Sequence, residues 1–290
     1  MIPASFDYHR AGSLEEAIGL LTRYKADAKL LSGGMSLLPM LKLRLGSFAH
    51  LVDISRIAGL EYIKEDKGVV RIGAGTRQAT LERSDLLKAK FGVLADAVPL
   101  IADPLVRNRG TIGGNVANGD PANDHPAIMI ALGAELVVRG PKGERTIPAN
   151  RFYKELFVTD LKQDEILVEL RLPLPPPRTG SAYRKLKRKT GDYAVAAVAV
   201  RLTLDAKGAV ERAGIALTNV APTPVEAVDA SKMLVGKVLD DKNILEAAKL
   251  AANAGKPSPD RRGSVEYKRE MTRVLCTRAL KDAAERAGRN

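Results

Sequence analysis

The sequence is short of the side chains on which several kinds of function depend. Its 290 residues contain no tryptophan, one cysteine and three histidines, and only 4% of them are aromatic. Single-stranded nucleic acid is usually bound on stacked aromatic rings, so this composition argues against a nucleic-acid-binding module despite the net charge of +12. No run of about 18 apolar residues is available to span a membrane. The N-terminus shows no secretory signal, so we expect a cytoplasmic protein.

Residues that bind metals or perform acid–base chemistry are equally sparse. His9, His50 and His125 lack the His-Glu-x-x-His spacing and have no cysteine nearby, so the pattern predicts no metal site. An iron–sulfur cluster needs four ligands, normally cysteines, and this chain has one. A catalytic pair of carboxylates is also disfavoured, because Asp120-Pro121 is typical of a turn and Asp124 of a helix cap.

A proline-rich segment predicts a boundary in the chain. Leu172–Pro177 contains four prolines in six residues, and neither a helix nor a central strand is expected to continue through it. Before it, short helix signals such as the capping box Ser13–Glu16 alternate with short strand signals such as Ala28–Leu31. After it, three strand candidates precede two helical stretches: 181–187, 194–204, 214–218, 242–252 and 264–287.

Two glycine-rich loops carry the clearest chemical signal. In the first, a strand candidate leads into Ser32–Ser36, and the second is Thr111–Asn115. Paired glycines let a backbone approach a ligand and turn its amides inward, and the hydroxyls add donors, which suits a pyrophosphate. Each pair alone is more often a tight turn than a ligand site. Neither loop matches the Gly-x-Gly-x-x-Gly or Gly-Lys-Ser/Thr nucleotide motifs, which indicates a different cofactor fold.

In combination, these motifs resemble a known family. The segment Ser32–Arg44 resembles the first flavin-binding loop of the medium subunit of molybdenum hydroxylases such as aerobic carbon monoxide dehydrogenase and xanthine dehydrogenase. Thr111–Asn115, followed by Asp120–Asp124, resembles the second loop, with the same order and spacing. The likeness extends through Ile72–Thr76, Gly191–Tyr193 and the C-terminal part, so it covers nearly the whole chain.

The resemblance implies an α+β fold in two domains. A p-cresol methylhydroxylase-type FAD-binding domain would span residues 1–173, as two α+β subdomains at about 1–56 and 57–173. A smaller C-terminal α+β domain with a short antiparallel sheet and helices would span residues 178–290. The proline-rich segment fits this division.

The resemblance also implies which residues bind FAD. Both loops would hold the pyrophosphate, and Asp124 would lie near the ADP ribose. Tyr193 belongs to the segment that faces the flavin ring in the family, although a tyrosine at the end of a strand is as often half-buried packing. Met35 stands where relatives commonly have histidine or glutamine, which leaves the backbone amides available. The predicted FAD-binding residues are Ser32, Gly33, Gly34, Met35, Ser36, Leu37, Thr111, Ile112, Gly113, Gly114, Asn115, Asp120, Asp124 and Tyr193.

The implied function is electron transfer without a substrate site of its own. Flavin can join one-electron iron–sulfur centres to a two-electron acceptor. The partners implied are a small [2Fe-2S] subunit and a large molybdenum–pterin subunit, assembled as a heterotrimer or its dimer. The alternative is a self-sufficient FAD-dependent oxidase or dehydrogenase of the same fold type. No strong acid–base pair or covalent flavin anchor stands out in the sequence to support that alternative.

Overall fold

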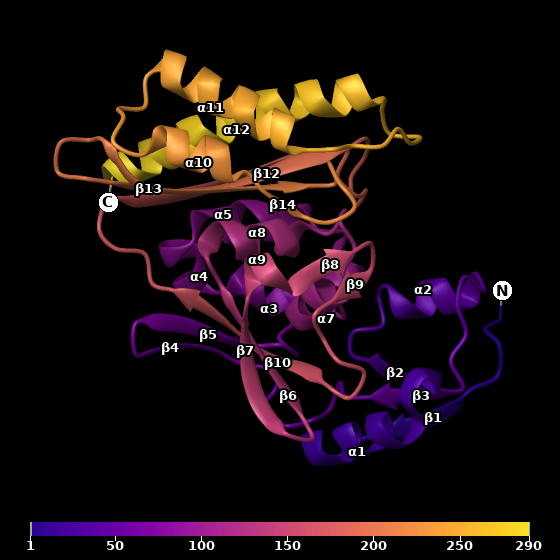
Figure 1. Ribbon diagram of the computed structural model, residues 1–290. Helices are drawn as coiled ribbons and strands as arrows, with labels where there is room; N and C mark the ends of the chain where they lie inside the picture. The colour runs from indigo at the N-terminus through magenta and orange to yellow at the C-terminus, as the bar shows by residue number, and fades with distance from the viewer. Residues whose placement is uncertain (1, 290) are drawn as a thin grey trace.

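The fold begins with a three-stranded parallel sheet, shown in indigo in Figure 1. The structure, a computed structural model, describes residues 2–289. The strand order is β1-β3-β2, with bounds Asp7–Arg10 (β1), Ala28–Leu31 (β2) and His50–Asp53 (β3). Two helices, Leu14–Tyr24 (α1) and Leu37–Lys42 (α2), follow β1 and β2. The α1 helix starts as predicted, because the Ser13 hydroxyl accepts a hydrogen bond from the Glu16 amide at 3.1 Å.

A five-stranded antiparallel sheet forms the centre of the molecule. Its order is β4-β5-β10-β6-β7, with bounds Ile63–Asp66 (β4), Val69–Gly73 (β5), Glu135–Gly140 (β6), Gly143–Pro148 (β7) and Ile166–Pro173 (β10). The connections carry seven helices: Gln78–Arg83 (α3), Asp85–Lys90 (α4), Gly92–Ala97 (α5), Pro104–Arg107 (α6), Ile112–Ala117 (α7), Asp124–Leu132 (α8) and Ala149–Phe152 (α9). A small hairpin follows at Tyr153–Glu155 (β8) and Val158–Thr159 (β9).

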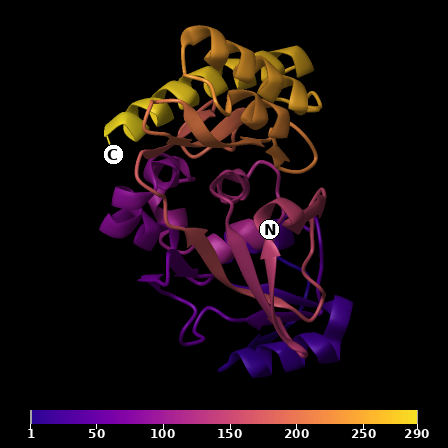
Figure 2. The ribbon, with the colours of Figure 1, turned by 60° about the vertical axis from the view of Figure 1, so that its left-hand side comes forward.

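The C-terminal part is an antiparallel sheet with helices on both faces (Figures 1 and 2). Its strands are Thr179–Leu186 (β11), Ala196–Leu204 (β12), Val210–Thr218 (β13) and Val225–Glu226 (β14), paired in that order. The outer face carries Val228–Leu234 (α10), Asp241–Ala254 (α11) and Val265–Arg289 (α12). The inner face packs on α5 and α8 of the central part.

Residue size alternates along β12 and explains why both faces can be covered. Ala197 and Ala199 belong to the core shared with α5 and α8, whereas Val198 and Val200 belong to the core under α10–α12. Small side chains let the inner helices come close to the sheet. On the neighbouring strand, a Cβ added to Gly214 would lie 2.3 Å from a carbonyl oxygen of α8. The alanine-rich run in the sequence therefore marks a close contact between the C-terminal sheet and the central part of the molecule.

The structure confirms the predicted α+β fold class and corrects several element bounds. The strands predicted at 181–187 and 214–218 begin earlier, at Thr179 and Val210. The sequence patterns missed α10 and most helices between 85 and 132, which are short or buried all round. Among residues 2–289, no helix combines the length and apolar character needed to cross a membrane.

Candidate functional site

The first glycine loop, Ser32–Ser36, joins β2 to α2 and keeps its backbone donors free. Gly34 adopts φ +74°, a left-handed conformation that other residues rarely reach. Within residues 2–289, the amides from Gly33 to Ser36 donate no hydrogen bond. Successive free amides at a glycine turn are typical of backbone sites that bind anions. Leu37, the last predicted residue here, begins α2 and is half-buried.

The backbone amides of the second loop, Thr111–Asn115, donate hydrogen bonds to acceptors within the protein from Ile112 onward. The Ile112 amide donates to the Thr76 carbonyl and the Gly113 amide donates to the Ala74 carbonyl, both at 2.9 Å. Thr111 is the N-cap of α7, and its hydroxyl accepts a hydrogen bond from the Gly114 amide at 3.1 Å. The Asn115 amide donates to the Thr111 carbonyl, as an ordinary helix bond. This loop can therefore offer a ligand its side chains and its shape, but few backbone donors.

The two loops lie against each other, although 79 residues separate them in the chain. The hydroxyl oxygens of Ser32 and Thr111 are 3.1 Å apart, within hydrogen-bond distance. A Cβ added to Gly33 would lie 2.2 Å from the carbonyl oxygen of Arg109, closer than real atoms come. Only glycine fits at this position, so the sequence pattern reflects a backbone-to-backbone contact between the loops. The Met35 side chain lies beside Gly110, on the same contact.

The segment after α7 brings two further predicted residues into place. The Asn115 carbonyl accepts a hydrogen bond from the Asn123 side chain at 2.9 Å. The Asn115 side-chain oxygen is buried and has no hydrogen-bond partner among the described residues. Asp120 closes a turn by accepting from the Ala122 amide at 2.9 Å. Burial raises the pKa of Asp120, while the Ala122 amide opposes the rise.

Asp124 is held inside the protein by the C-terminal sheet. Its carboxylate accepts hydrogen bonds from the Tyr183 hydroxyl at 2.6 Å and from the Lys185 ammonium at 2.9 Å. The side chains of Asp124 and Lys185 are only 6% and 2% exposed, so their ion pair is almost fully removed from water. Burial raises the pKa of Asp124, and the Lys185 charge opposes that rise. Both carboxylate oxygens are therefore already bound to residues of β11.

His125, the next residue in the chain, has a structural role in the surroundings of the second loop. The His125 Nε2 atom lies 2.8 Å from the side-chain oxygen of Gln78. The backbone amide of Gln78 donates to the Gly110 carbonyl, beside the second loop. Burial lowers the pKa of His125 to about 3, so the ring is neutral. A neutral ring with Nε2 as the donor fits this contact. His125 thus supports the second loop from behind.

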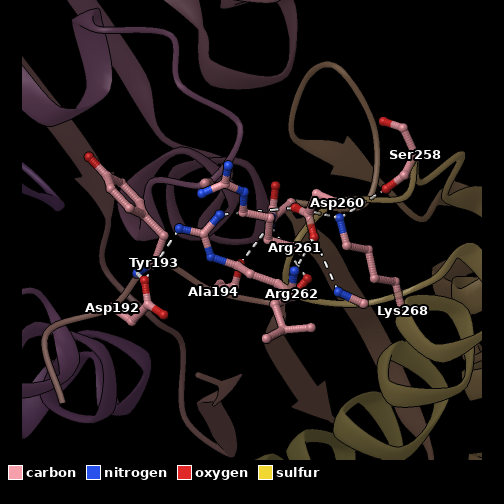
Figure 3. A network of polar contacts seen from close by, with 12 residues as sticks. Asp192, Tyr193, Ala194, Ser258, Asp260, Arg261, Arg262 and Lys268 are labelled. Atoms are coloured by element: carbon pink, nitrogen blue, oxygen red, sulfur yellow. Dashed lines mark hydrogen bonds and ion pairs between the residues drawn. The ribbon is translucent and has the colours of Figure 1, made fainter. Parts of the chain in front are cut away.

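Tyr193 lies on the connection between β11 and β12, beside a network of charged side chains (Figure 3). The Arg262 guanidinium lies 5.8 Å from the Tyr193 ring centroid and donates to Asp192 at 3.3 Å. Lys268, on α12, pairs with Asp260 at 2.9 Å and fixes the segment that carries Arg262. The Tyr193 side chain remains 43% exposed. Its ring is therefore held on one side by the arginine and still accessible to a ligand.

Asn219 joins two of the predicted segments and was not predicted from the sequence. The backbone amide of Asn219 donates to the Pro121 carbonyl at 2.9 Å, and its side-chain amide donates to the Ala194 carbonyl at 2.6 Å. The backbone of Asn219 is left-handed, with φ +61°, a conformation that asparagine tolerates. One residue at the end of β13 thus links the Asp120 turn to the Tyr193 segment. A single asparagine after a strand is too common a signal to indicate a site.

Two contacting glycine loops, one of them with a row of free backbone amides, are features typical of a protein that binds a nucleotide cofactor. The comparisons with known proteins specify the cofactor. Residues 4–175 match the family described as FAD binding domain in molybdopterin dehydrogenase, and residues 181–283 match the CO dehydrogenase flavoprotein C-terminal domain. The chain therefore belongs to the family of FAD-binding medium subunits of molybdenum hydroxylases, and it is an oxidoreductase subunit.

Individual relatives cover the whole length of the chain. It is 47% identical over 287 residues to the carbon monoxide dehydrogenase medium chain of Afipia carboxidovorans, covering 99% of each. It is 30% identical over 284 residues to the xanthine dehydrogenase FAD-binding subunit of Escherichia coli O157:H7, covering 97% of each. A solved structure of carbon monoxide dehydrogenase from Hydrogenophaga pseudoflava is 47% identical, with a TM-score of 0.96 and coverage of 99% of both chains. These relatives are named as chains or subunits of larger dehydrogenases.

Proposed function

We propose that this chain passes electrons from iron–sulfur clusters on a small partner subunit to an external acceptor. In the proposed complex, a large molybdenum–pterin subunit oxidises the substrate, and the three chains form a heterotrimer or its dimer. The membership of the family supports this proposal. So does the single cysteine, Cys276, which is fully buried under the C-terminal sheet and leaves this chain without ligands for a cluster.

The observation that carries the proposal is the row of free amides in the first loop. We propose that the amides from Gly33 to Ser36 bind the FAD pyrophosphate, because they follow one another at a turn and have no partner in the described chain. The hydroxyls of Ser32 and Thr111 lie where the loops meet and would add side-chain donors. When bound, FAD exchanges electrons singly or in pairs, which lets it connect one-electron centres to a two-electron acceptor.

The other predicted residues take different parts in this proposal. The unpartnered Asn115 side-chain oxygen would accept a hydrogen bond from the nucleotide. The Tyr193 ring, held by Arg262, would cover the flavin ring, and the Asp120 turn would lie beside it through Asn219. Asp124 stays a predicted neighbour of the ADP ribose. Since Tyr183 and Lys185 already bind both of its oxygens, its contribution would be to the shape of the site.

Anaerobic flavin reduction tests the proposal directly. We expect carbon monoxide, purines and aromatic heterocycles to leave the absorbance of the isolated FAD-loaded chain unchanged, whereas dithionite bleaches it. Adding the cognate iron–sulfur and molybdenum subunits should make bleaching depend on the substrate of the complex. Rapid bleaching of the isolated chain by any of these substrates would favour the self-sufficient flavoprotein and contradict the proposal.

A further inference from the structure

The parallel sheet at the N-terminus brings together two histidines that are 41 residues apart in the chain. Asp7 and His9 lie two positions apart on β1 and therefore project from the same face of the sheet. On the adjacent strand, His50 pairs in register with Asp7. The His9 Nε2 and His50 Nδ1 atoms are 3.1 Å apart, and an Asp7 carboxylate oxygen lies 3.5 Å from the same Nδ1. All three possible ligand atoms lie within 4.8 Å of one another.

Hydrogen bonding alone accounts poorly for this arrangement, because both neighbours approach one nitrogen atom. If His50 Nδ1 accepts a proton from His9, its lone pair faces the negative Asp7 carboxylate. If Nδ1 instead carries the proton, that single hydrogen must be shared between His9 and Asp7. In either case one close contact is left weak or repulsive. A cation between the three atoms would make all of the contacts favourable.

Two of the three distances between the possible ligand atoms agree with those around a tetrahedral metal ion. Zinc binds histidine nitrogen and carboxylate oxygen at about 2.0–2.2 Å, which places ligand atoms roughly 3.3–3.5 Å apart at the corners of a tetrahedron. The observed separations of 3.1 and 3.5 Å fall around these values. The Asp7 side chain is 76% exposed and the His50 side chain 18%, so the site is open to water on the aspartate side. A water molecule could supply the fourth ligand.

The surroundings orient the two rings. The Tyr24 ring stacks on His50, with centroids 3.7 Å apart, and on His9, with centroids 5.2 Å apart. Tyr24 is the last residue of α1, so these contacts bring the cluster to the carboxyl end of that helix. The partial negative charge at a helix carboxyl end favours a cation. The rings are therefore held in place before any ion arrives.

We propose that Asp7, His9 and His50 form a binding site for a divalent transition-metal ion of the zinc type. The site is separate from the glycine loops, because His50 begins β3 whereas the first loop follows the other end of the parallel strand β2. An ion bound there links the edge strand β1 to the central strand β3 of the sheet that supports the first loop. Its effect is to stabilise that sheet. This inference does not depend on the electron-transfer proposal.

Zinc titration of the full-length chain tests the site. The protein carries no histidine tag, is freed of metal with a chelator, and is titrated with ZnCl2 in a calorimeter. We expect one zinc ion per chain and a higher Tm with zinc than without it. His9→Ala and His50→Ala should weaken binding by at least about 100-fold, which exceeds the roughly 10- to 100-fold cost of changing an outer-shell partner. Asp7→Asn should weaken binding by about tenfold or more, since one charged ligand is lost.

Asp229→Asn is the matched control, because Asp229 is an exposed carboxylate on α10, outside the cluster. It should bind zinc as the unaltered chain does. X-ray absorption of the zinc-loaded protein should show nitrogen and oxygen ligands only. Because Asp7 is highly exposed, Asp7→Asn tests the site even if His50→Ala fails to fold. The proposal is wrong if the unaltered chain binds no stoichiometric zinc. It is also wrong if the Asp7 and His9 variants bind zinc as tightly as the unaltered chain does.

Discussion

The two glycine-rich loops share a sequence pattern and differ in the hydrogen bonds that their backbone amides make. From Gly33 to Ser36 the amides are free in the described chain, whereas those from Ile112 to Asn115 all donate to protein acceptors. We call the first loop ligand-facing, because we propose that its free amides bind FAD, and we call the segment from Thr111 to His125 protein-facing, because protein acceptors already bind its amides. The comparison teaches that a Gly-Gly pair can mark either a ligand's approach or a backbone's approach. Only the hydrogen-bond partners separate the two cases.

The largest effect is expected at Asp124, because protein groups already bind both of its carboxylate oxygens. Asp124→Ala would leave the Lys185 ammonium, whose side chain is 2% exposed, without a counterion. Breaking one partner of a buried ion pair costs about 3–5 kcal/mol of stability. Urea denaturation should show this loss. FAD retention should fall in step with stability, while the reduction potential of any bound flavin stays nearly unchanged.

Removing both charges provides the control for Asp124. The double variant with Asp124→Ala and Lys185→Met replaces the pair with apolar side chains and should recover most of the lost stability, because such replacements are often close to neutral. If Asp124→Ala instead lost FAD at unchanged stability, Asp124 would belong with the ligand-facing residues. That result would contradict the assignment of Asp124 to the protein-facing segment.

A smaller effect, on FAD affinity, is expected at Gly33. Gly33→Val places a Cβ where the Arg109 carbonyl oxygen is 2.2 Å away, so the two loops must separate. Overpacking of this kind costs about 1–3 kcal/mol, which corresponds to roughly 5- to 150-fold weaker binding if it falls on the FAD-bound form. Titration of the apoprotein with FAD, followed by flavin fluorescence, measures the change.

Two further glycines serve as controls for Gly33. Gly114→Ala should weaken FAD binding less, since Gly114 is exposed and a Cβ there would meet only the Thr111 hydroxyl. Gly19→Ala on α1, where no atom lies within 4 Å of the added Cβ, should leave binding unchanged. Equal losses at Gly33 and Gly114 would remove the distinction between the loops.

The smallest effect is expected at Thr111, whose hydroxyl both contacts the ligand-facing first loop and caps α7 in the protein-facing segment. Thr111→Val removes the N-cap of α7 and the hydroxyl contact with Ser32, at a cost of about 1 kcal/mol of stability. Thr111→Ser keeps the hydroxyl and should retain both contacts. Urea denaturation of the two variants with and without FAD separates the cap from the contact between loops. Identical behaviour of the valine and serine variants would show that the hydroxyl serves neither.

The sequence predicts the fold class and the sites of both loops because their signals are local. A capping box, an alternating strand and a Gly-Gly turn are each encoded within a few residues, and Ser13 and Gly34 behave in the structure as those patterns indicate. The second Gly-Gly pair differs, because Gly113 and Gly114 lie inside α7, which Thr111 caps. The acceptors that the backbone amides of the second loop bind are not encoded locally. The partners of Ile112 and Gly113 come from a segment near residue 75, and nothing within their own loop reveals them.

The contacts that the sequence did not predict are those made across the fold. His9 and His50 meet only because β1 and β3 pair in parallel register. Asp124 meets Lys185, 61 residues away, only because the C-terminal sheet packs on α8. The division into domains at 1–173 and 178–290 stays a prediction. The inner face of the C-terminal sheet and the helices α5 and α8 share one hydrophobic core across that boundary.

The alanine face of β12 and the helices α5 and α8 leave the ribosome at different times. The strands that cover α5 and α8 end at Thr218, about 86 residues after α8 ends at Leu132, and at roughly 5–20 residues per second this stretch needs on the order of 4–17 s to be synthesised. Throughout that interval the apolar surfaces of α5 and α8 lack the sheet that buries them, and exposed apolar patches of this kind favour aggregation. A chain that stopped at the proline-rich segment would remain in that state. The C-terminal sheet therefore also sets when the nascent flavin-binding part becomes safe from aggregation.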